Sequence, residues 1–189
     1  MAEREYKLIF AGSMGAGKTT AIAAISEIPP VSTDVRNTDL ATHSKATTTT
    51  AMDYGEITLE NGGKLRLYGT PGQERFDFMW KILSRGALGI VLLVDNSRPD
   101  PIADMRTYLD PLADVIQTSR LVVGVGRTDS HSAPSIDDYY AALAVKGISA
   151  PVFSVDVRER ALVLLLLDAL FNQIESAERS TASASAIPQ

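Results

Sequence analysis

Short apolar runs alternate along this chain with longer segments in which apolar and polar residues mix. Apolar runs of this length, bounded by glycine, proline and polar clusters, are typical of buried strands, and the mixed segments have helical composition. The predicted strands cover residues 7–11, 51–59, 64–68, 89–94, 121–125 and 151–154. The predicted helices cover residues 19–28, 77–85, 101–118, 135–145 and 158–177. Strands that alternate with helices favour an α/β fold in three layers, with a mainly parallel sheet between the helices.

The second and third strands are joined by Asn61-Gly62-Gly63, a strong hairpin signal. We therefore expect a six-stranded, mostly parallel sheet with one antiparallel edge strand and about five helices. In such sheets ligands lie outside the carboxyl ends of the strands. The long polar segments 29–50 and 69–76 read as loops at that edge, and loops of this length are usually functional.

The length of 189 residues fits one domain, which we place at residues 1–178. Residues 179–189 are small and low in complexity, which predicts a disordered tail. The apolar run 161–167 is too short to span a bilayer and is followed by Asp168, so a helix packed into the core is expected and no integral membrane segment.

One motif carries specific chemistry. Residues 12–19, Gly-Ser-Met-Gly-Ala-Gly-Lys-Thr, complete the phosphate-binding P-loop pattern and stand between the first strand and the first helix. The glycines let backbone N–H groups turn toward the α- and β-phosphates, Lys18 supplies a positive charge toward the β- and γ-oxygens, and the Thr19 hydroxyl can bind Mg²⁺. This pattern predicts a nucleoside triphosphate as ligand.

Composition excludes several other classes of protein. The formal charge of −5 and the lack of a basic run argue against nucleic-acid binding. Without cysteine there is no disulfide, thiol nucleophile or thiolate zinc site, and two isolated histidines cannot build a histidine-rich metal centre. The first residues lack the apolar core of a signal peptide, and the chain has no cysteine to prenylate, so we expect a cytoplasmic protein.

Several loops resemble those of Ras-like small GTPases, in the family's order and spacing. Residues 49–54 resemble the first switch threonine and the strand that follows it, and Gly72-Gln73-Glu74-Arg75-Phe76 resembles the second switch. Residues 121–129 resemble the strand and loop that read the base, and residues 153–155 the last loop against the purine. The resemblance covers residues 5–175 and implies a Ras-like G domain, a P-loop NTPase.

The resemblance implies GTP or GDP with Mg²⁺ as ligands. Thr49 would complete the metal shell and sense the γ-phosphate, Gln73 would orient the attacking water, and Lys18 would neutralise charge. The residues expected to contact nucleotide are Gly12, Met14, Gly15, Ala16, Gly17, Lys18, Thr19, Thr20, Gly72, Arg127, Asp129, Ser154 and Val155.

Two departures from the family pattern narrow the branch. Most members have an aspartate on the Mg²⁺ shell where this chain has Gly69, within Gly69-Thr70-Pro71-Gly72. Bacterial GTPases of the MglA type and those of actinobacterial conservons also lack it, and they use an aspartate on the second strand instead. Asp53 occupies the matching place, so the metal candidates are Thr19, Thr49 and Asp53. The alternative is a solvated aspartate that blunts a sheet edge.

The second departure lies in the base-reading loop, where the family has Asn-Lys-x-Asp and this chain has Gly126-Arg127-Thr128-Asp129. Asp129 keeps the carboxylate that can accept hydrogen bonds from N1 and N2 of guanine. Adenine has no donors at these positions and would leave a buried carboxylate unpaired. Arg127 can stack over the base. Gly126 offers no side chain, so affinity or guanine selectivity is expected to be reduced. A helix cap or turn is the alternative role for Asp129.

These features predict a small GTPase acting as a slow molecular switch whose residues 34–50 and 69–80 change conformation between nucleotide states. No arginine stands beside Thr49, so an activator is expected, in related proteins of the roadblock type, together with an effector. Two alternatives are a nucleotide-binding scaffold without hydrolysis and a small-molecule kinase, although the latter lacks an acceptor site here. Phe76, Phe78, Met79 and Trp80 are expected to supply an apolar partner surface, or in part core.

Overall fold

The computed structural model describes residues 4–31, 34–36, 47–49, 52–72 and 77–185. The main sheet consists of β1 (Glu5–Ala11), β4 (Asp53–Thr58), β5 (Lys64–Gly69), β6 (Gly89–Asp95), β7 (Arg120–Gly126) and β8 (Val152–Ser154). The helices are α1 (Lys18–Ile25), α2 (Asp77–Ser84), α3 (Pro101–Leu109), α4 (Ala113–Thr118), α5 (Ile136–Val145) and α6 (Arg160–Ser185). A separate ribbon pairs β2 (Asp34–Arg36) with β3 (Thr47–Thr49).

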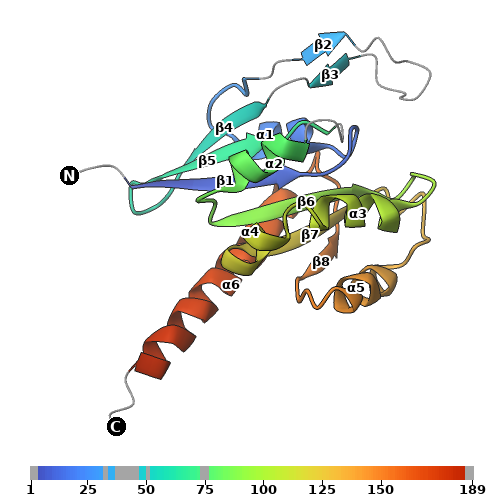
Figure 1. The fold of residues 1–189 in the computed structure, drawn as a ribbon. Coiled ribbons are helices and arrows are strands. Elements are labelled where there is room, and N and C mark those ends of the chain that lie inside the picture. Colours follow the sequence, from blue (N-terminus) through green and yellow to red (C-terminus); the bar gives the residue numbers. More distant parts are fainter. Residues whose placement is uncertain (1–3, 32–33, 37–46, 50–51, 73–76, 186–189) are drawn as a thin grey trace.

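The strands of the main sheet follow the order β4-β5-β1-β6-β7-β8 (Figure 1). Only the edge strand β4 runs antiparallel to its neighbour among these six, and every other pair is parallel. This arrangement confirms the predicted α/β class with a mostly parallel sheet and one antiparallel edge strand. The carboxyl ends of the parallel strands therefore meet at one edge, where the loops of the candidate site begin.

Alternate residues of the central strands enter two separate cores, which defines the three layers. Leu8 and Phe10 of β1 pack with α1 and α6, whereas Ile9 and Ala11 pack with α2, α3 and α5. The apolar run 161–167 lies in α6, and its buried side chains belong to the first of these cores. No described helix is both long and apolar enough to cross a membrane.

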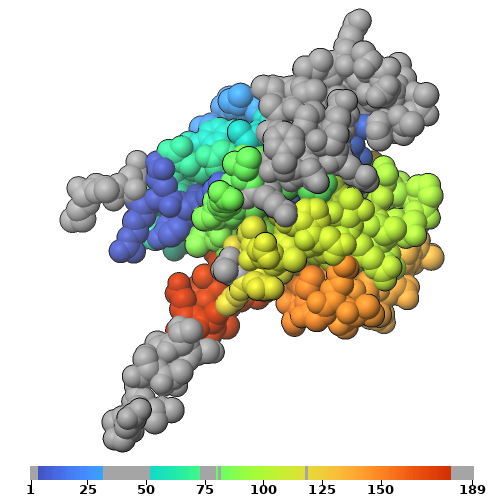
Figure 2. Space-filling model, in the orientation of Figure 1, coloured from blue at the N-terminus to red at the C-terminus, as the bar shows by residue number. Residues whose placement is uncertain are grey.

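Helix α5 lies beside α3 on the same face of the sheet, as Figure 2 shows. Residues of both helices line a cavity of about 580 Å³. Tyr139 of α5 is fully buried, and its hydroxyl reaches the end of β6 at Asn96. Helix α5 is thus hydrogen-bonded to the segment at the carboxyl end of β6.

Four elements differ from the sequence prediction. The helix expected over 101–118 is two helices, because Pro111 cannot donate a backbone hydrogen bond and Leu112 leaves the helical conformation at φ −96° and ψ 2°. Helix α1 ends at Ile25 rather than residue 28, since Ser26 is extended. The ribbon of β2 and β3 lies within the segment expected to be a loop. Helix α6 continues to Ser185, seven residues into the segment expected to be a disordered tail, and projects from the body in Figure 1.

Candidate functional site

The loop between β1 and α1 turns so tightly that glycine is required at two positions. Gly12 has φ 137°, and an added Cβ there would lie 2.1 Å from the Leu93 carbonyl oxygen. Gly17 has φ 97° and caps α1, and an added Cβ would lie 2.6 Å from Cγ2 of Val157. Because the loop ends at the first turn of α1, its amides and the helix N-terminus form one anion-binding corner.

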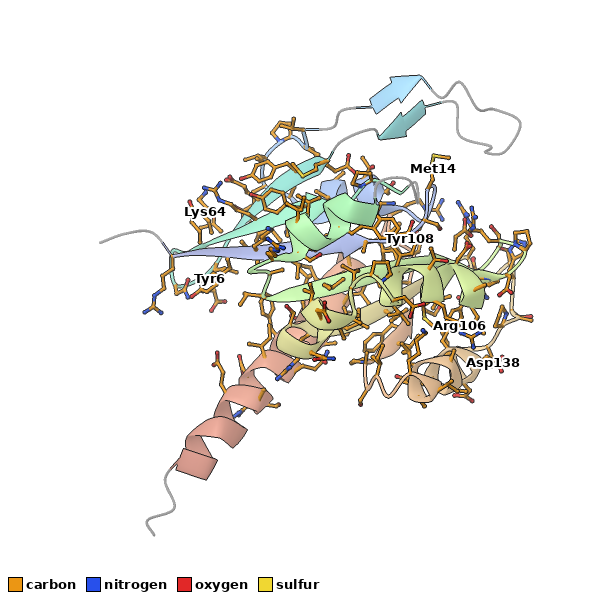
Figure 3. All side chains as sticks on the ribbon, in the orientation of Figure 1. Tyr6, Met14, Lys64, Arg106, Tyr108 and Asp138 are labelled. Carbon is orange, nitrogen blue, oxygen red and sulfur yellow. The ribbon has the colours of Figure 1, made fainter. Side chains whose placement is uncertain are left out.

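Lys18 begins α1 and is almost fully buried. Its ammonium group donates hydrogen bonds to the carbonyl oxygens of Gly12 at 2.7 Å and Ser13 at 2.9 Å. The positive charge is therefore held at the loop that would receive the phosphates. Met14, on the same loop, is labelled in Figure 3 at the same end of the molecule as Tyr108 of α3.

The next residue, Thr19, joins the P-loop to the edge strand. Its hydroxyl donates a 2.7 Å hydrogen bond to Oδ2 of Asp53, the first residue of β4. Asp53 is fully buried, and its other oxygen, Oδ1, has no hydrogen-bond partner within the described part of the chain. A buried carboxylate oxygen without a partner is costly unless a cation or water satisfies it.

Asp53 lies directly opposite Gly69 in the antiparallel pair of β4 and β5. An added Cβ at Gly69 would lie 3.0 Å from both Cβ and Oδ2 of Asp53. The carboxylate thus fills the space that a side chain at Gly69 would take. The alternative role of Asp53, a solvated aspartate that blunts the sheet edge, is wrong, because the segment after α1 covers β4 and Asp53 is fully buried.

The loop that leaves β5 is pinned by two aromatic side chains. Trp80 of α2 donates from Nε1 to the Pro71 carbonyl at 2.9 Å, and Tyr108 of α3 donates to the Gly72 carbonyl at 3.0 Å. The two rings stack with centroids 4.2 Å apart. Gly72 presses on the P-loop, since an added Cβ would lie 2.6 Å from the Met14 amide nitrogen. Trp80 is fully buried, so for this residue the expected partner surface is wrong and core is right.

The base-reading loop leaves β7 after Gly126. Arg127 has φ 64°, forms an ion pair with Asp95 and donates from Nη1 to the Ser97 hydroxyl at 3.1 Å. The hydroxyls of Thr128 and Ser154 share a hydrogen bond, which joins this loop to the end of β8. Asp129 therefore lies in a loop that is tied to both neighbouring strands.

A cavity of about 440 Å³ lies between these loops. It is lined by residues of the P-loop and start of α1, the end of β6, the base-reading loop and the loop after β8: Gly15, Ala16, Gly17, Thr20, Val94, Asp95, Gly126, Arg127, Asp129, Ser130, Val155, Asp156, Val157 and Arg158. Seven residues expected to contact nucleotide, from three separate loops, thus share one hollow: Gly15, Ala16, Gly17, Thr20, Arg127, Asp129 and Val155. The neighbouring Lys18, Thr19, Asp53 and Gly72 meet at the P-loop.

Sequence reasoning missed residues on the far wall of this cavity. They are Asp95, which ends the apolar strand β6, and Asp156. Asp156 accepts hydrogen bonds from the Arg158 side chain, and these lower the pKa of Asp156 to about 2. The run Asp95-Asn96-Ser97 directly after a buried strand was the available signal, because polar residues at the carboxyl end of a strand face the ligand edge.

Two expected residues lie outside what can be described. Gln73 is outside the described residues, and for Thr49 only the backbone, in β3, is described. Among the residues that the structure covers there is no group of three acidic or histidine side chains able to hold a metal ion alone. A metal at this site would therefore depend on phosphate oxygens as well.

Comparison with known proteins gives matches of two kinds. A family model described as "Conserved hypothetical ATP binding protein" matches residues 30–132, more than half of the chain. That match begins after the P-loop and ends just beyond Asp129. It therefore includes the candidate metal carboxylate, the loop after β5 and the base-reading loop.

Relatives include the Ras-related protein RabC of Dictyostelium discoideum, 22% identical over 93% of this chain and 87% of its own length. An uncharacterized protein of Methanocaldococcus jannaschii is 32% identical over 52% of this chain, and the Ras-related protein Rab-8A of Gallus gallus is 31% identical over 55% of it. This chain covers 56% and 46% of the lengths of these two proteins.

The weak similarity to Ras-related proteins and the α/β architecture agree with a Ras-like P-loop GTPase fold. The similarity supports a nucleotide-binding switch in general terms. The family model matches more than half of the chain, including the loop after β5 and the base-reading loop, and this match shows the family. The chain thus belongs to the family described as conserved hypothetical ATP binding proteins.

Proposed function

We propose that this chain is a small GTP-binding protein that acts as a nucleotide-dependent switch and hydrolyses GTP to GDP slowly on its own. The observation that carries the proposal is the cavity of about 440 Å³ that joins the P-loop to Asp129. A P-loop alone supports phosphate binding, and a carboxylate across the same cavity adds a means to read the base.

Guanine rather than adenine follows from the hydrogen bonds that a carboxylate can make. Asp129 can accept from the N1–H and the N2 amino group of guanine, whereas adenine offers neither donor on that edge. Arg127 supplies a planar guanidinium beside the same cavity, which suits stacking on a purine. The proposal thus departs from the nucleotide named in the family description, and the base becomes the property to measure.

The residues at the P-loop fit a Mg²⁺ ion that binds together with the nucleotide. The unpartnered Oδ1 of Asp53 is a buried anionic oxygen beside the Thr19 hydroxyl, the donor chemistry that Mg²⁺ takes directly or through water. Thr19, Thr49 and Asp53 would hold the ion. When bound, Mg²⁺ supplies positive charge to the β- and γ-phosphates.

Hydrolysis requires positioning and charge more than covalent chemistry from the protein. We assign Lys18 to charge neutralisation, Gly72 to a backbone hydrogen bond toward the γ-phosphate, and Gln73 to orientation of the attacking water. Thr48, not an arginine, precedes Thr49. The intrinsic rate is therefore low, and a protein activator, of the roadblock type in the MglA-like branch, would add a factor of about 10³ to 10⁵. An effector, a role in bacterial signalling or polarity and a cytoplasmic location complete the proposal.

Paired variants test binding and hydrolysis separately. Lys18→Ala should abolish stable binding of labelled GDP, because the P-loop then lacks its buried charge, whereas Gln73→Leu should bind like wild type and hydrolyse GTP more slowly. Lys146→Ala, which removes a lysine paired with Asp110 away from the cavity, is the matched control. Failure of the wild type to bind GDP would contradict the proposal. Equal hydrolysis by wild type and Gln73→Leu would show that Gln73 does not orient the attacking water, and a wild type that binds GTP without hydrolysing it would favour the regulatory scaffold.

A further inference from the structure

The base-reading loop is held in place although Gly126 contributes no side chain to hold it. Its anchors come from the neighbouring strand. Asp95, the last residue of β6, pairs with Gly126 in the sheet register, and the Asn96 amide donates to the Gly126 carbonyl at 3.1 Å. The segment Asp95-Asn96-Ser97 therefore runs beside the start of the loop.

Asn96 anchors the far end of the loop. Its side chain is 98% buried, and Nδ2 donates to the carbonyl oxygens of His131 at 2.6 Å and Pro134 at 3.1 Å. Oδ1 accepts a 2.6 Å hydrogen bond from the hydroxyl of Tyr139. Nδ2 donates to two carbonyl oxygens and Oδ1 accepts from one hydroxyl, so only this orientation of the amide satisfies all three hydrogen bonds. Burial, with the charges of nearby aspartates, raises the pKa of Tyr139, so the hydroxyl keeps its proton.

Asp95 and Ser97 anchor the near end. Both reach Arg127, Asp95 through the ion pair and Ser97 through its hydroxyl, and the Ser97 hydroxyl in turn donates to Oδ1 of Asp95 at 2.6 Å. The two ends are also joined directly, because the His131 amide donates to the Arg127 carbonyl at 2.9 Å. Asp129 lies in the chain between these two anchored residues.

We propose that Asp95-Asn96-Ser97 sets the position of Asp129 and thereby the preference for guanine, with Asn96 as the main positioning residue. This rests on the proposed function. Asn96 does not line the nucleotide cavity, so it acts through the loop and not on the base. In this chain the loop-fixing amide, that of Asn96, directly follows β6, whereas the Ras-like pattern places an asparagine at the end of the next strand.

Positioning and general stability make different predictions for the two bases. Hydrogen bonds to a carboxylate weaken steeply when their angles change, so a shifted Asp129 loses contacts that only guanine makes. The side chain of Asn96 bonds to His131, Pro134 and Tyr139, whereas the phosphates of either nucleotide would bind at the P-loop. Loss of the anchor should therefore reduce guanine binding and leave adenine binding as it was.

The test compares wild type with Asn96→Ala in competition assays of GDP and ADP against labelled GDP, using the full chain. We expect GDP affinity to fall about tenfold, the order expected for impaired carboxylate hydrogen bonds, with ADP affinity unchanged, so that the GDP-to-ADP ratio falls by the same factor. Asn61→Ala is the matched control: Asn61 accepts a 2.9 Å hydrogen bond in the hairpin turn and should leave the ratio unaltered. Tyr139→Phe, a milder change, should shift the ratio in the same direction by about two- to threefold.

A second variant asks whether the missing side chain can be supplied at its family position. An added Cβ at Gly126 would lie 3.6 Å from the Val155 carbonyl oxygen and 3.7 Å from that of Val94, so Gly126→Asn can be accommodated. In the Asn96→Ala background it should restore part of the GDP-to-ADP ratio. An unchanged ratio in Asn96→Ala, or an equal loss for GDP and ADP, would overturn the inference. A wild type without preference for GDP would contradict the proposed function itself, and the inference with it.

Discussion

At the scale of single residues, the most specific feature of the site is that the carboxylate stands at Asp53 and not at Gly69, the residue opposite it. The resemblance to MglA-type GTPases implied that Asp53, at the matching place on the second strand, could replace a carboxylate missing at Gly69. The burial of Asp53 could not be read from spacing, because it depends on residues that cover the outer edge of β4. Val31 pairs with Tyr54 through two hydrogen bonds, and the Glu27 amide donates to the Glu56 carbonyl.

Removal of this carboxylate should weaken the metal site. We expect Asp53→Ala to raise the Mg²⁺ concentration required for hydrolysis and to speed nucleotide release, because the ion then lacks an anionic acceptor among its protein contacts. Release of labelled GDP at several Mg²⁺ concentrations measures both effects. Asp110→Ala, which removes an exposed aspartate paired with Lys146, is the control.

The reciprocal change makes the test specific. Gly69→Asp in the Asp53→Ala background should partly restore the Mg²⁺ dependence, since its carboxylate can take the space that the Asp53 carboxylate has left, whereas the remaining Cβ of residue 53, 3.0 Å from the new Cβ, keeps the restoration partial. The same change in wild type should destabilise the fold, because the new Cβ would lie 3.0 Å from Oδ2 of Asp53. Unchanged Mg²⁺ dependence in Asp53→Ala would end the metal assignment.

At the scale of elements, α2 and α3 together hold the start of the loop that leaves β5. Trp80 and Tyr108 hold consecutive carbonyls, of Pro71 and Gly72, and the same loop leads to Gln73. The sequence predicted both helices but assigned Trp80 to a partner surface. A single strongly apolar residue in an amphipathic helix does not reveal which neighbour it stacks on, and here that neighbour is 28 residues further along the chain.

Tyr108→Phe should remove the hydrogen bond to the Gly72 carbonyl and leave the stacking of the Trp80 and Tyr108 rings unchanged. Loss of one hydrogen bond is worth about 1 kcal/mol, a factor of about 5. We expect affinity for a non-hydrolysable GTP analogue to fall by about this factor and GDP affinity to stay constant, because only the γ-phosphate would contact Gly72. Trp80 is the sole tryptophan, so its fluorescence reports the exchange of GDP for the analogue directly.

The control is Tyr140→Phe, which removes a hydroxyl that bonds to Val152 at the other edge of the sheet. Equal losses of GDP and analogue affinity in Tyr108→Phe would show that this hydrogen bond contributes only to the stability of the fold. Identical Trp80 emission in both nucleotide states would argue that the loop does not respond to the γ-phosphate.

At the scale of the whole molecule, alternating apolar runs were sufficient to predict the layers and the mostly parallel sheet. They specify which segments are buried, and short connections restrict how parallel strands can be joined. Of the two parts that were missed, the first has a local cause and the second depends on tertiary contacts. Pro111 divided the helix expected over 101–118, and the support of the base-reading loop by β6 arises only when strands 25 or more residues apart become neighbours.

We propose that the cavity recognises guanine, and nucleotide competition on the wild-type protein measures this preference. Labelled GDP bound in the presence of Mg²⁺ is displaced with unlabelled GTP, GDP, ATP and ADP. We expect the guanine nucleotides to compete at concentrations at least about a hundredfold lower, because adenine leaves Asp129 without its donors. Equal displacement by ATP and GTP would contradict the account.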